Sequence, residues 1–376
     1  MSRFLIACGG TGGHLAPGIA LAEGLVARGH EAHLLISRKQ VDARLSQKYP
    51  QLSFARVPAA PLGAHPAALA RFVWHQSAGF VFSWRYLRQI RPDVVIGFGG
   101  FTSVAVVLAG WMRHVPVALH EANRVPGRAV RLLARFAQRV YLPPGVRLRR
   151  LHANVARAQG LPVRAEFQRM PRAAAFAALN LQPARRLLAV LGGSQGAAAL
   201  NDWAERNLEA LALDGVQVFC VSGPGQRSTH EERLRRTREG MRVKSYFVPF
   251  CDQMPALLSA ADLVVSRAGA GTLAELARVG TPGVLVPFPG AADDHQAANA
   301  RFFEQQGGGL VVDQRYLGGL IKEVQDVIGN DWLLRKFREN LHRMDQENSL
   351  TAMLNDLERL PRTRPTAPPR IALKLA

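Results

Sequence analysis

Residues 3–28 read RFLIACGGTGGHLAPGIALAEGLVAR, and this stretch decides the fold. An apolar strand at residues 3–8 runs into a glycine loop, and a helix follows in which Ile19, Ala22 and Val26 share one face. The same order returns at residues 186–211, where the apolar segment RLLAVL leads into Gly-Gly-Ser-Gln-Gly and a second helix. The repeated strand, glycine loop and helix predict two similar α/β domains.

Strand and helix signals alternate through both halves of the chain. Strands rich in Val, Leu and Ile that alternate with helices are typical of parallel sheets covered on both faces. The predicted fold class is therefore α/β, with two Rossmann-like domains. The expected strands are residues 3–8, 32–37, 52–57, 93–97, 115–120 and 139–142 in the first domain, and 186–191, 216–222, 243–248, 263–266, 283–287 and 310–312 in the second.

The domain boundaries follow from the same pattern. Gly160 and Pro162 interrupt the periodicity, which places the hinge at residues 159–164. We expect an N-terminal domain at residues 1–160, a second domain at 161–345, and a C-terminal helix and tail at 346–376. The last helical region is expected from Trp332 to Leu360, and the proline- and arginine-rich residues 361–376 are expected to form a mobile tail.

Composition narrows the class of protein. The chain has 376 residues, of which 48% are hydrophobic, as in a globular protein with a large core. Its formal charge of +20 favours an anionic partner such as nucleic acid, anionic lipid or a phosphorylated substrate, although an arginine bias of the whole lineage would also explain it. The three cysteines, Cys8, Cys220 and Cys251, have no metal-ligand spacing, which predicts a reducing compartment without disulfides.

The hydrophobic runs are short. Residues 4–8 are too few for a secretory signal, and residues 104–112 fall far below the roughly 20 residues of a membrane span. We therefore expect the chain in the cytosol, or on a membrane from its cytosolic side.

Three glycine loops, at residues 9–14, 97–103 and 192–196, each follow a strand and precede a helix. Glycines let the backbone approach a ligand, and a helix N-terminus offers N–H groups and partial positive charge, so a phosphate or diphosphate is the natural ligand. Loops at the carboxyl ends of neighbouring strands face one crevice. A nicotinamide cofactor is disfavoured, because Leu15 takes the third glycine position of G-x-G-x-x-G and no acidic residue ends the second strand, although Arg38 and Lys39 leave a phosphorylated one conceivable.

Residues 266–299 hold the densest group of polar side chains. The amides of residues 266–272, with Thr272, can cap a diphosphate. Glu275 comes one turn later and suits a ribose diol, although a glutamate in the first turn of a helix is also favoured by the dipole. The acidic and amide side chains at residues 293–296 suit sugar hydroxyls. A metal site there is weakly supported, since adjacent aspartates point to different sides of a helix.

Together these motifs resemble the family of UDP-N-acetylglucosamine–lipid-linked muramyl-pentapeptide N-acetylglucosaminyltransferases of bacterial peptidoglycan synthesis. The resemblance covers about residues 3–345 and is far more specific than any single glycine loop. It rests on six segments in the same order and spacing: residues 9–14, 97–103, 120–123 (His-Glu-Ala-Asn), 192–201, 266–275 and 293–299.

The resemblance implies a GT-B fold, with two Rossmann-like domains whose parallel sheets face a cleft. It implies donor binding in the C-terminal domain and acceptor binding in the N-terminal domain. The implied reaction is inverting transfer of N-acetylglucosamine from UDP-GlcNAc to the 4-hydroxyl of MurNAc-pentapeptide on undecaprenyl diphosphate, without metal or cofactor. The implied location is the cytoplasmic face of the inner membrane, as a peripheral protein.

Individual site residues follow from the resemblance. Those implied to bind the donor are Arg164, Ser194, Phe250, Cys251, Gly269, Ala270, Gly271, Thr272, Glu275, His295 and Gln296. Those implied to lie on the acceptor and phosphate side are Thr11, Gly12, Gly13, Gly99, Gly100 and Asn123. His14 is the first candidate for the catalytic base, because imidazole titrates near neutral pH, and Glu121 is the second. His14 could equally anchor the acceptor phosphate or its own loop.

Three places depart from the family pattern. Leu161 replaces an asparagine in the interdomain segment, Ala122 replaces a glutamine in the His-Glu-Gln-Asn motif, and Val104-Ala105 follow Ser103 where Gly-Pro is usual. These changes concern the hinge and the acceptor loops and leave the sugar-nucleotide class unaffected.

Alternative functions remain open at this stage. The enzymatic alternatives are a UDP-N-acetylglucosamine 2-epimerase or a glycolipid glycosyltransferase of the same fold. A nucleic-acid-binding protein is disfavoured, because the chain has no helix-turn-helix, RRM or zinc motif and that function would leave the glycine loops unexplained.

Residues 67–91 combine aromatic rings with arginines. Such a mixture suits a bilayer interface, where rings lie among headgroups and cations meet phosphates, so we expect an anionic membrane surface as a partner. The same rings could instead fill the core between helix and sheet. The residues are Phe72, Trp74, Phe80, Phe82, Trp84 and Tyr86, with Arg71, Arg85, Arg88 and Arg91.

Overall fold

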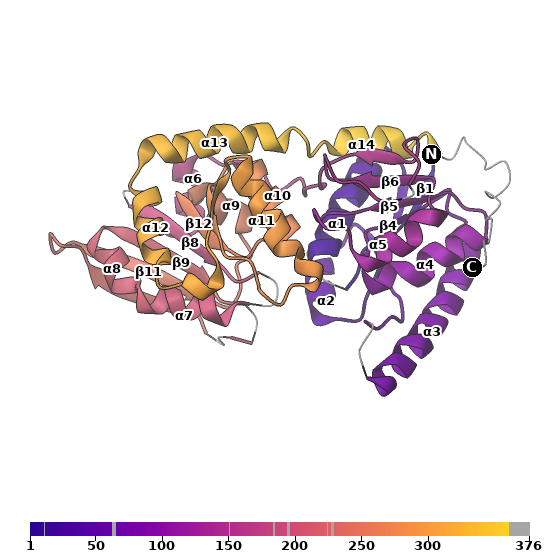
Figure 1. The fold of residues 1–376 in the computed structure, drawn as a ribbon, viewed down its shortest axis with the longest axis horizontal. Helices are drawn as coiled ribbons and strands as arrows, with labels where there is room; N and C mark the ends of the chain where they lie inside the picture. The colour runs from indigo at the N-terminus through magenta and orange to yellow at the C-terminus, as the bar shows by residue number, and fades with distance from the viewer. Residues whose placement is uncertain are drawn as a thin grey trace.

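The computed structural model describes residues 1–360 except 11, 62–64, 150, 183–184, 194–195, 224 and 227–228, and the predicted tail at 361–376 lies outside the described residues. Its N-terminal half forms a seven-stranded sheet in the order β3-β2-β1-β4-β5-β6-β7, with every pairing parallel (Figure 1). The strands are β1 (Arg3–Ala7), β2 (Glu31–Ile36), β3 (Ser53–Arg56), β4 (Val94–Gly97), β5 (Val117–His120), β6 (Arg139–Leu142) and β7 (Ala156–Ala158). The helices are α1 (Gly12–Ala27), α2 (Gln40–Ser46), α3 (Pro66–Ile90), α4 (Gly100–Met112) and α5 (Arg128–Leu133).

The second half repeats this architecture. Its sheet has the order β10-β11-β9-β8-β12-β13-β14, in which β10 alone pairs antiparallel. The strands are β8 (Arg186–Leu191), β9 (Val216–Val221), β10 (Glu231–Arg236), β11 (Arg242–Val248), β12 (Leu263–Ser266), β13 (Gly283–Leu285) and β14 (Gly309–Val311). The helices are α6 (Arg172–Ala178), α7 (Ala198–Arg206), α8 (Leu208–Leu213), α9 (Met254–Ala260), α10 (Ala270–Val279), α11 (His295–Gln305), α12 (Leu320–Ile328), α13 (Asp331–Asp345) and α14 (Leu350–Leu357).

The two Rossmann-like domains predicted from the sequence are confirmed. In each sheet the first strand of the domain lies centrally, with later strands added on both sides, so both sheets have a switch point where the strand order reverses. The strands at each centre are buried, as parallel strands covered by helices on both faces must be. The glycine loops after β1, β4 and β8 therefore lie at the carboxyl edges of the sheets.

The chain passes between the domains twice, and the two passages touch. The first is the predicted hinge, where the amide of Gly160 donates to the carbonyl of Glu347 at 2.9 Å. The second follows α13, which lies along the C-terminal domain, and leads to α14, which returns to the N-terminal domain (Figure 1). Gln159 Nε2 donates to the carbonyl of Ser349 at 2.8 Å, so the two passages are joined side by side.

Helix α14 completes the core of the N-terminal domain. Met353, Leu354 and Leu357 are buried in the same cluster as the strands of the first sheet. Leu354 packs where α1 has Gly24, so the helices approach closely. The single helical region expected from Trp332 to Leu360 is therefore two helices, and Ser349 caps the second by accepting from the amide of Ala352 at 3.3 Å.

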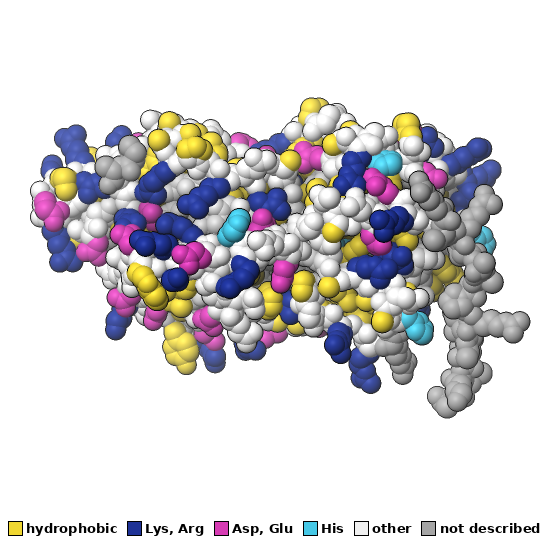
Figure 2. Space-filling model, turned by 90° about the horizontal axis from the view of Figure 1, so that it is seen from above, with side chains coloured by type: hydrophobic (Ala, Val, Ile, Leu, Met, Phe, Trp, Pro, Cys, Tyr) yellow, Lys and Arg dark blue, Asp and Glu magenta, His cyan; other side chains and the backbone are white. Residues whose placement is uncertain are grey.

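Two surface properties bear on function. No helix within the described residues is long and apolar enough to cross a membrane. Lys and Arg side chains cover both halves of the face seen in Figure 2, so the positive charge of the chain is not confined to one domain.

Candidate active site

The two glycine loops of the N-terminal domain lie against each other, as the sequence predicted. Thr102 Oγ1 in α4 donates to the carbonyl of Gly9 at 3.0 Å, and Ser103 Oγ donates to that of Ala7 at 3.1 Å. A Cβ atom on Gly9 would lie 2.2 Å from the amide nitrogen of Ser37, so only glycine fits there. The loops after β1 and β4 thus form one edge of the cleft.

His14 lies in the first turn of α1 beside the second loop. A Cβ atom on Gly100 would lie 3.1 Å from His14 Cε1, and Gly99 also borders the ring. Burial lowers the pKa of His14 to about 4, although the charge of Asp42 opposes the shift. The imidazole is therefore neutral at pH 7, but its pKa lies well below the near-neutral value expected from the sequence, which makes His14 a weaker base than expected. Gly12 and Gly13 share its turn, whereas Thr11 lies outside the described residues.

Glu121 follows β5 and has both carboxylate oxygens engaged. Oε1 accepts from the amide of Asn123 at 2.8 Å and from its Nδ2 at 3.1 Å, while Oε2 accepts from the amide of Gly127 at 2.7 Å. The residue is only 4% exposed. This geometry favours a role in shaping the loop of residues 121–127.

The predicted donor loop lies in the C-terminal domain, where β12 leads into α10. Gly269 is the N-cap of this helix, and Ala270, Gly271 and Thr272 form its first turn. A Cβ atom on Gly271 would have no described neighbour within 4 Å, so space is open beside the turn. First-turn amides next to open space suit an anionic ligand. Ser194, in the loop after β8, lies outside the described residues.

Glu275, one turn into α10, is bonded to Arg164 of the interdomain segment. Arg164 Nη2 donates to Glu275 Oε1 at 3.1 Å, and its Nη1 donates to the hydroxyl of Tyr49 at 3.2 Å. Glu166 Oε1 lies 2.8 Å from the same Nη1. Burial raises the pKa of Glu275, while Arg164 lowers it. Two residues predicted to bind the donor therefore meet each other, and Tyr49 of the N-terminal domain joins them.

Phe250 and Cys251 follow β11 and face helix α2 of the other domain. The guanidinium of Arg44 lies 3.8 Å from the ring centroid of Phe250, and Lys48 Nζ lies 2.6 Å from Asp252 Oδ1. Cys251 is buried, and burial raises the pKa of its thiol. Its side chain is thus a neutral part of the core, which leaves the backbone of this segment to meet a ligand.

The start of α11 is held by local contacts and by the N-terminal domain. Gln296 Oε1 accepts from the amide of Phe288 at 3.0 Å, and His295 Nδ1 lies 2.7 Å from the carbonyl of Ala292. Asp293 pairs with Arg128 and Arg131 of α5. Its carboxylate is therefore occupied by cations. Among the described residues, no group of three or more His, Cys, Asp or Glu side chains could hold a metal ion.

Asn299 joins the two sides of the cleft, a role that the sequence did not reveal. Its Oδ1 accepts from the amide of Arg124 at 2.9 Å, and its Nδ2 donates to Asn123 Oδ1 at 3.1 Å and to the carbonyl of Ala268 at 3.2 Å. It thus links the loop after β5 in the N-terminal domain to the loop after β12 in the C-terminal domain. Its place three residues after Gln296, on the same turn of α11, was the only sequence signal.

Comparison with known families now decides the class of protein. The N-terminal domain model of glycosyltransferase family 28 matches residues 4–142, and the C-terminal domain model of that family matches residues 187–351. This chain belongs to glycosyltransferase family 28. The two matches of family 28 coincide with the two Rossmann-like domains of the structure.

Two relatives carry the name UDP-N-acetylglucosamine–N-acetylmuramyl-(pentapeptide) pyrophosphoryl-undecaprenol N-acetylglucosamine transferase. The protein of Opitutus terrae is 60% identical over 363 residues, which are 96% of either chain. That of Verminephrobacter eiseniae is 39% identical and covers 83% of this chain and 86% of its own. The predicted family resemblance is confirmed.

Solved structures agree with the fold. The crystal structure of Acinetobacter baumannii MurG matches with a TM-score of 0.65 at 23% identity, covering 95% of this chain and 99% of that one. The glycosyltransferase of kitacinnamycin matches with a TM-score of 0.68 at 16% identity, covering 96% and 99%. The predicted GT-B arrangement of this family 28 enzyme is therefore confirmed.

Proposed function

We propose that this chain transfers N-acetylglucosamine from UDP-GlcNAc to the 4-hydroxyl of the muramyl sugar in undecaprenyl-diphosphate-MurNAc-pentapeptide, which converts lipid I to lipid II. The observation that carries this proposal is the 60% identity over 96% of either chain to a transferase named for that donor and acceptor. Neither a 2-epimerase nor a transferase to another glycolipid is favoured by this relationship.

Inverting transfer is a single in-line displacement, in which a base removes the acceptor proton as the diphosphate leaves. The first-turn amides of α10, from Ala270 to Thr272, are oriented to stabilise charge on the leaving UDP, and the helix dipole adds to them. The neutral imidazole of His14 is the proposed proton acceptor from the 4-hydroxyl. Gly99 and Gly100 keep the space beside the ring clear of side chains.

Donor recognition is proposed for the residues around α10 and α11. Glu275 would accept hydrogen bonds from the ribose diol, exchanging or sharing its contact with Arg164. His295 and Gln296, at the start of α11, are proposed to contact the sugar hydroxyls. The backbone of Phe250 and Cys251 is proposed to meet the uracil, and Ser194 with Gly269 the diphosphate.

Acceptor recognition is proposed for the N-terminal loops. The first turn of α1, with Gly12 and Gly13, offers amides to the acceptor diphosphate. Glu121 positions Asn123 beside this site through its bonds within the loop of residues 121–127. Asn299 is proposed to hold the acceptor loop and the donor loop at a fixed distance, because it donates hydrogen bonds to both.

Attachment to an anionic membrane surface is proposed for α3 in the N-terminal domain. Trp74 is 74% exposed near the start of this helix, and the exposed Leu69 and Val73 accompany it. Trp84, in contrast, packs against Phe80 with ring centroids 5.9 Å apart and lies under Arg113. The proposed membrane contact is therefore the first half of α3, whereas rings of its second half fill the space against α4.

The proposed reaction is tested with purified protein, UDP-GlcNAc and a short-chain lipid I analogue. UDP release should require the acceptor, and mass spectrometry should detect the lipid-linked disaccharide. Formation of free UDP and an epimerised sugar without acceptor would instead identify an epimerase and refute the transfer.

A further inference from the structure

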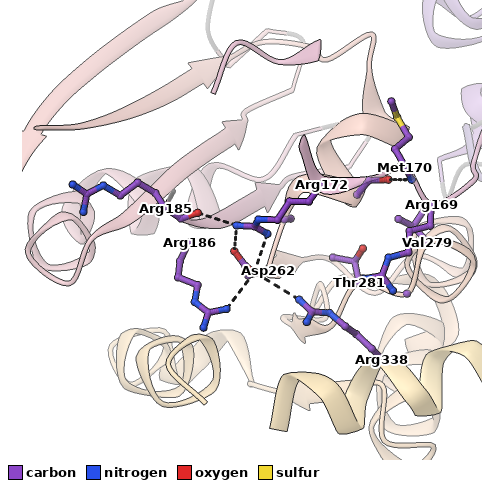
Figure 3. Close-up of a pocket in the computed structure, with 12 residues that line it drawn as sticks. Arg169, Met170, Arg172, Arg185, Arg186, Asp262, Val279, Thr281 and Arg338 are labelled. Carbon is purple, nitrogen blue, oxygen red and sulfur yellow. Dashed lines mark hydrogen bonds and ion pairs between the residues drawn. The ribbon is translucent and has the colours of Figure 1, made fainter. Parts of the chain in front are cut away.

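A pocket lies in the C-terminal domain, away from the glycine loops. It has a volume of about 420 Å³ and is bordered by Arg169, Arg172, Arg186, Asp262, Thr281 and Arg338 (Figure 3). Arg186 begins β8 and Asp262 immediately precedes β12, so the pocket lies at the amino ends of these strands. The donor loops lie at their carboxyl ends. The pocket is thus separated from the proposed active site by the length of the sheet.

One buried carboxylate organises three of the arginines. Asp262, 3% exposed, receives both Nη atoms of Arg172 at 3.0 Å, Arg186 Nη1 at 3.4 Å and Arg338 Nη2 at 3.7 Å. Its Oδ2 also accepts from the amide of Leu187 at 2.9 Å. Its two oxygens are therefore fully used, while each guanidinium has further N–H donors.

Positive charge in the pocket exceeds negative charge. Arg186 has a second partner, Asp331, but Arg169 has no acidic side chain within ion-pair distance among the described residues. Five arginines border the pocket, and the side chain of one, Arg185, turns away (Figure 3). The other four guanidinium groups have one lining carboxylate, Asp262, and a second outside the lining, Asp331, which leaves two positive charges uncompensated. Burial lowers the pKa of Arg338, and the positive charges of Arg169, Arg172 and Arg186 lower it further. The negative charge of Asp262 opposes this shift.

The shape of the site indicates the class of ligand. The guanidinium fork binds phosphate oxygens in a bidentate manner, and two excess positive charges match a phosphate monoester. A volume of about 420 Å³ falls in the range of small-molecule sites, so a larger group than phosphate alone can be held. Met170 and Val279 add apolar lining for such a group.

We propose that this pocket, which we call the arginine pocket, binds the phosphate monoester of a small molecule or of a lipid headgroup, with Arg169 and Arg338 as direct ligands. Both side chains reach the region beside Thr281 (Figure 3). Arg185 provides a matched control, because it borders the same pocket but its side chain turns away from the others, and only its carbonyl contacts Arg172 (Figure 3).

The test uses the full chain with its cleft saturated by UDP. Calorimetry with glycerol 3-phosphate is the soluble arm, and sedimentation with phosphatidylcholine vesicles containing phosphatidic acid is the lipid arm. Arg169→Gln and Arg338→Gln should each weaken binding roughly tenfold in at least one arm, the loss expected for one charge-assisted contact. Arg185→Gln, which removes the same charge, should match the wild type.

The two arms separate the sources of the ligand. A loss only with glycerol 3-phosphate assigns the pocket to a soluble phosphorylated compound, and a loss only with vesicles assigns it to a lipid headgroup. Because Arg169 has no ion pair to disrupt, its variant remains informative if Arg338→Gln misfolds. Failure of both probes to bind, or equal binding by all variants, would overturn the proposal and leave the arginines as counter-charges of Asp262.

Discussion

Arg164 Nη2 lies 3.1 Å from Glu275 Oε1, so the interdomain segment is bonded to the helix proposed to hold the donor. Arg164 is thus bonded to the carboxylate that we propose as the partner of the ribose. If Glu275 binds the ribose as proposed, donor binding is coupled to the position of the interdomain segment, because the ribose hydroxyls and Arg164 bind the same carboxylate.

Replacement of Glu275 tests the donor site. Glu275→Ala should raise KM for UDP-GlcNAc by roughly 5- to 150-fold, since loss of a buried hydrogen-bond acceptor costs about 1–3 kcal/mol. Glu275→Gln keeps an acceptor oxygen and should be impaired less. Steady-state kinetics at varied UDP-GlcNAc would count against the assignment if the alanine variant matched the wild type.

Asn299 should couple the acceptor and donor loops. Asn299→Ala removes its contacts to Asn123, Arg124 and Ala268, so we expect kcat, measured well below the unfolding midpoint, to fall at least tenfold. The thermal unfolding midpoint should also fall, because Asn299 is buried and its partners lose their hydrogen bonds. Asn299→Asp keeps the acceptor for the Arg124 amide but places a buried carboxylate against the oxygens of Asn123 and Ala268, so its kcat should fall at least as far as that of the alanine variant. A kcat equal to that of the wild type in both variants would exclude this coupling.

The fold should lose stability in mild acid. Burial lowers the pKa of His120 to about 4, and that of His14 is lowered similarly. Between pH 6.5 and 4 the unfolded chain binds more protons than the folded one, so the free energy of unfolding falls as pH drops, by about 1.4 kcal/mol per pH unit for each such histidine.

His120→Gln isolates one of these histidines, because glutamine can still donate toward the carbonyl of Gly160, which His120 Nε2 contacts at 3.3 Å. We expect the free energy of unfolding of this variant, measured with urea, to depend less steeply on pH over that window. The difference should correspond to about one bound proton. An unchanged slope would mean that His120 titrates normally in the folded chain.

Membrane attachment should depend on the first half of α3. Val73→Ala with Trp74→Ala should reduce sedimentation with anionic vesicles at low salt, because exposed apolar area is lost from the contact. Trp332→Ala is the control, since Trp332 is 63% exposed on the other domain. Both variants should turn over a soluble acceptor analogue. Equal loss of sedimentation in the two variants would argue against α3.

Transfer should proceed without a metal ion at the sugar diphosphate. Asp293 is paired with Arg128 and Arg131, and backbone amides of α10 are available for the leaving group. Initial rates should therefore persist in excess chelator. A complete loss that added divalent metal reverses would refute this prediction.

Local patterns in the sequence predicted most of the sheets but missed two edge strands. Apolar strands such as β8 and β12 were predicted at their observed bounds, because burial on both faces requires continuous apolar residues. Strand β10 reads EERLRR and was missed, since an edge strand can carry charge on both faces. Strand β7 reads ARA and was missed because it lacks the Val and Leu residues that marked the equally short β13 and β14.

The glycine loops and their grouping could be predicted, whereas the contacts across the cleft could not. Glycine loops carry a local signal, because particular backbone geometry requires glycine. The bonds of Arg164 to Tyr49 and of Asn299 to Asn123 join residues more than one hundred positions apart. Nothing in local periodicity encodes such distant partners. Likewise, the return of α14 to the first domain depends on the arrangement of both domains.

The return of α14 to the N-terminal domain affects how the chain folds during its synthesis. The face of α1 that receives Leu354 stays uncovered until the last helix has been synthesised. The first domain to leave the ribosome is therefore the last to finish its core, with apolar surface exposed during most of translation. A ribosome that stalls within the second domain would release a nascent chain in need of a chaperone.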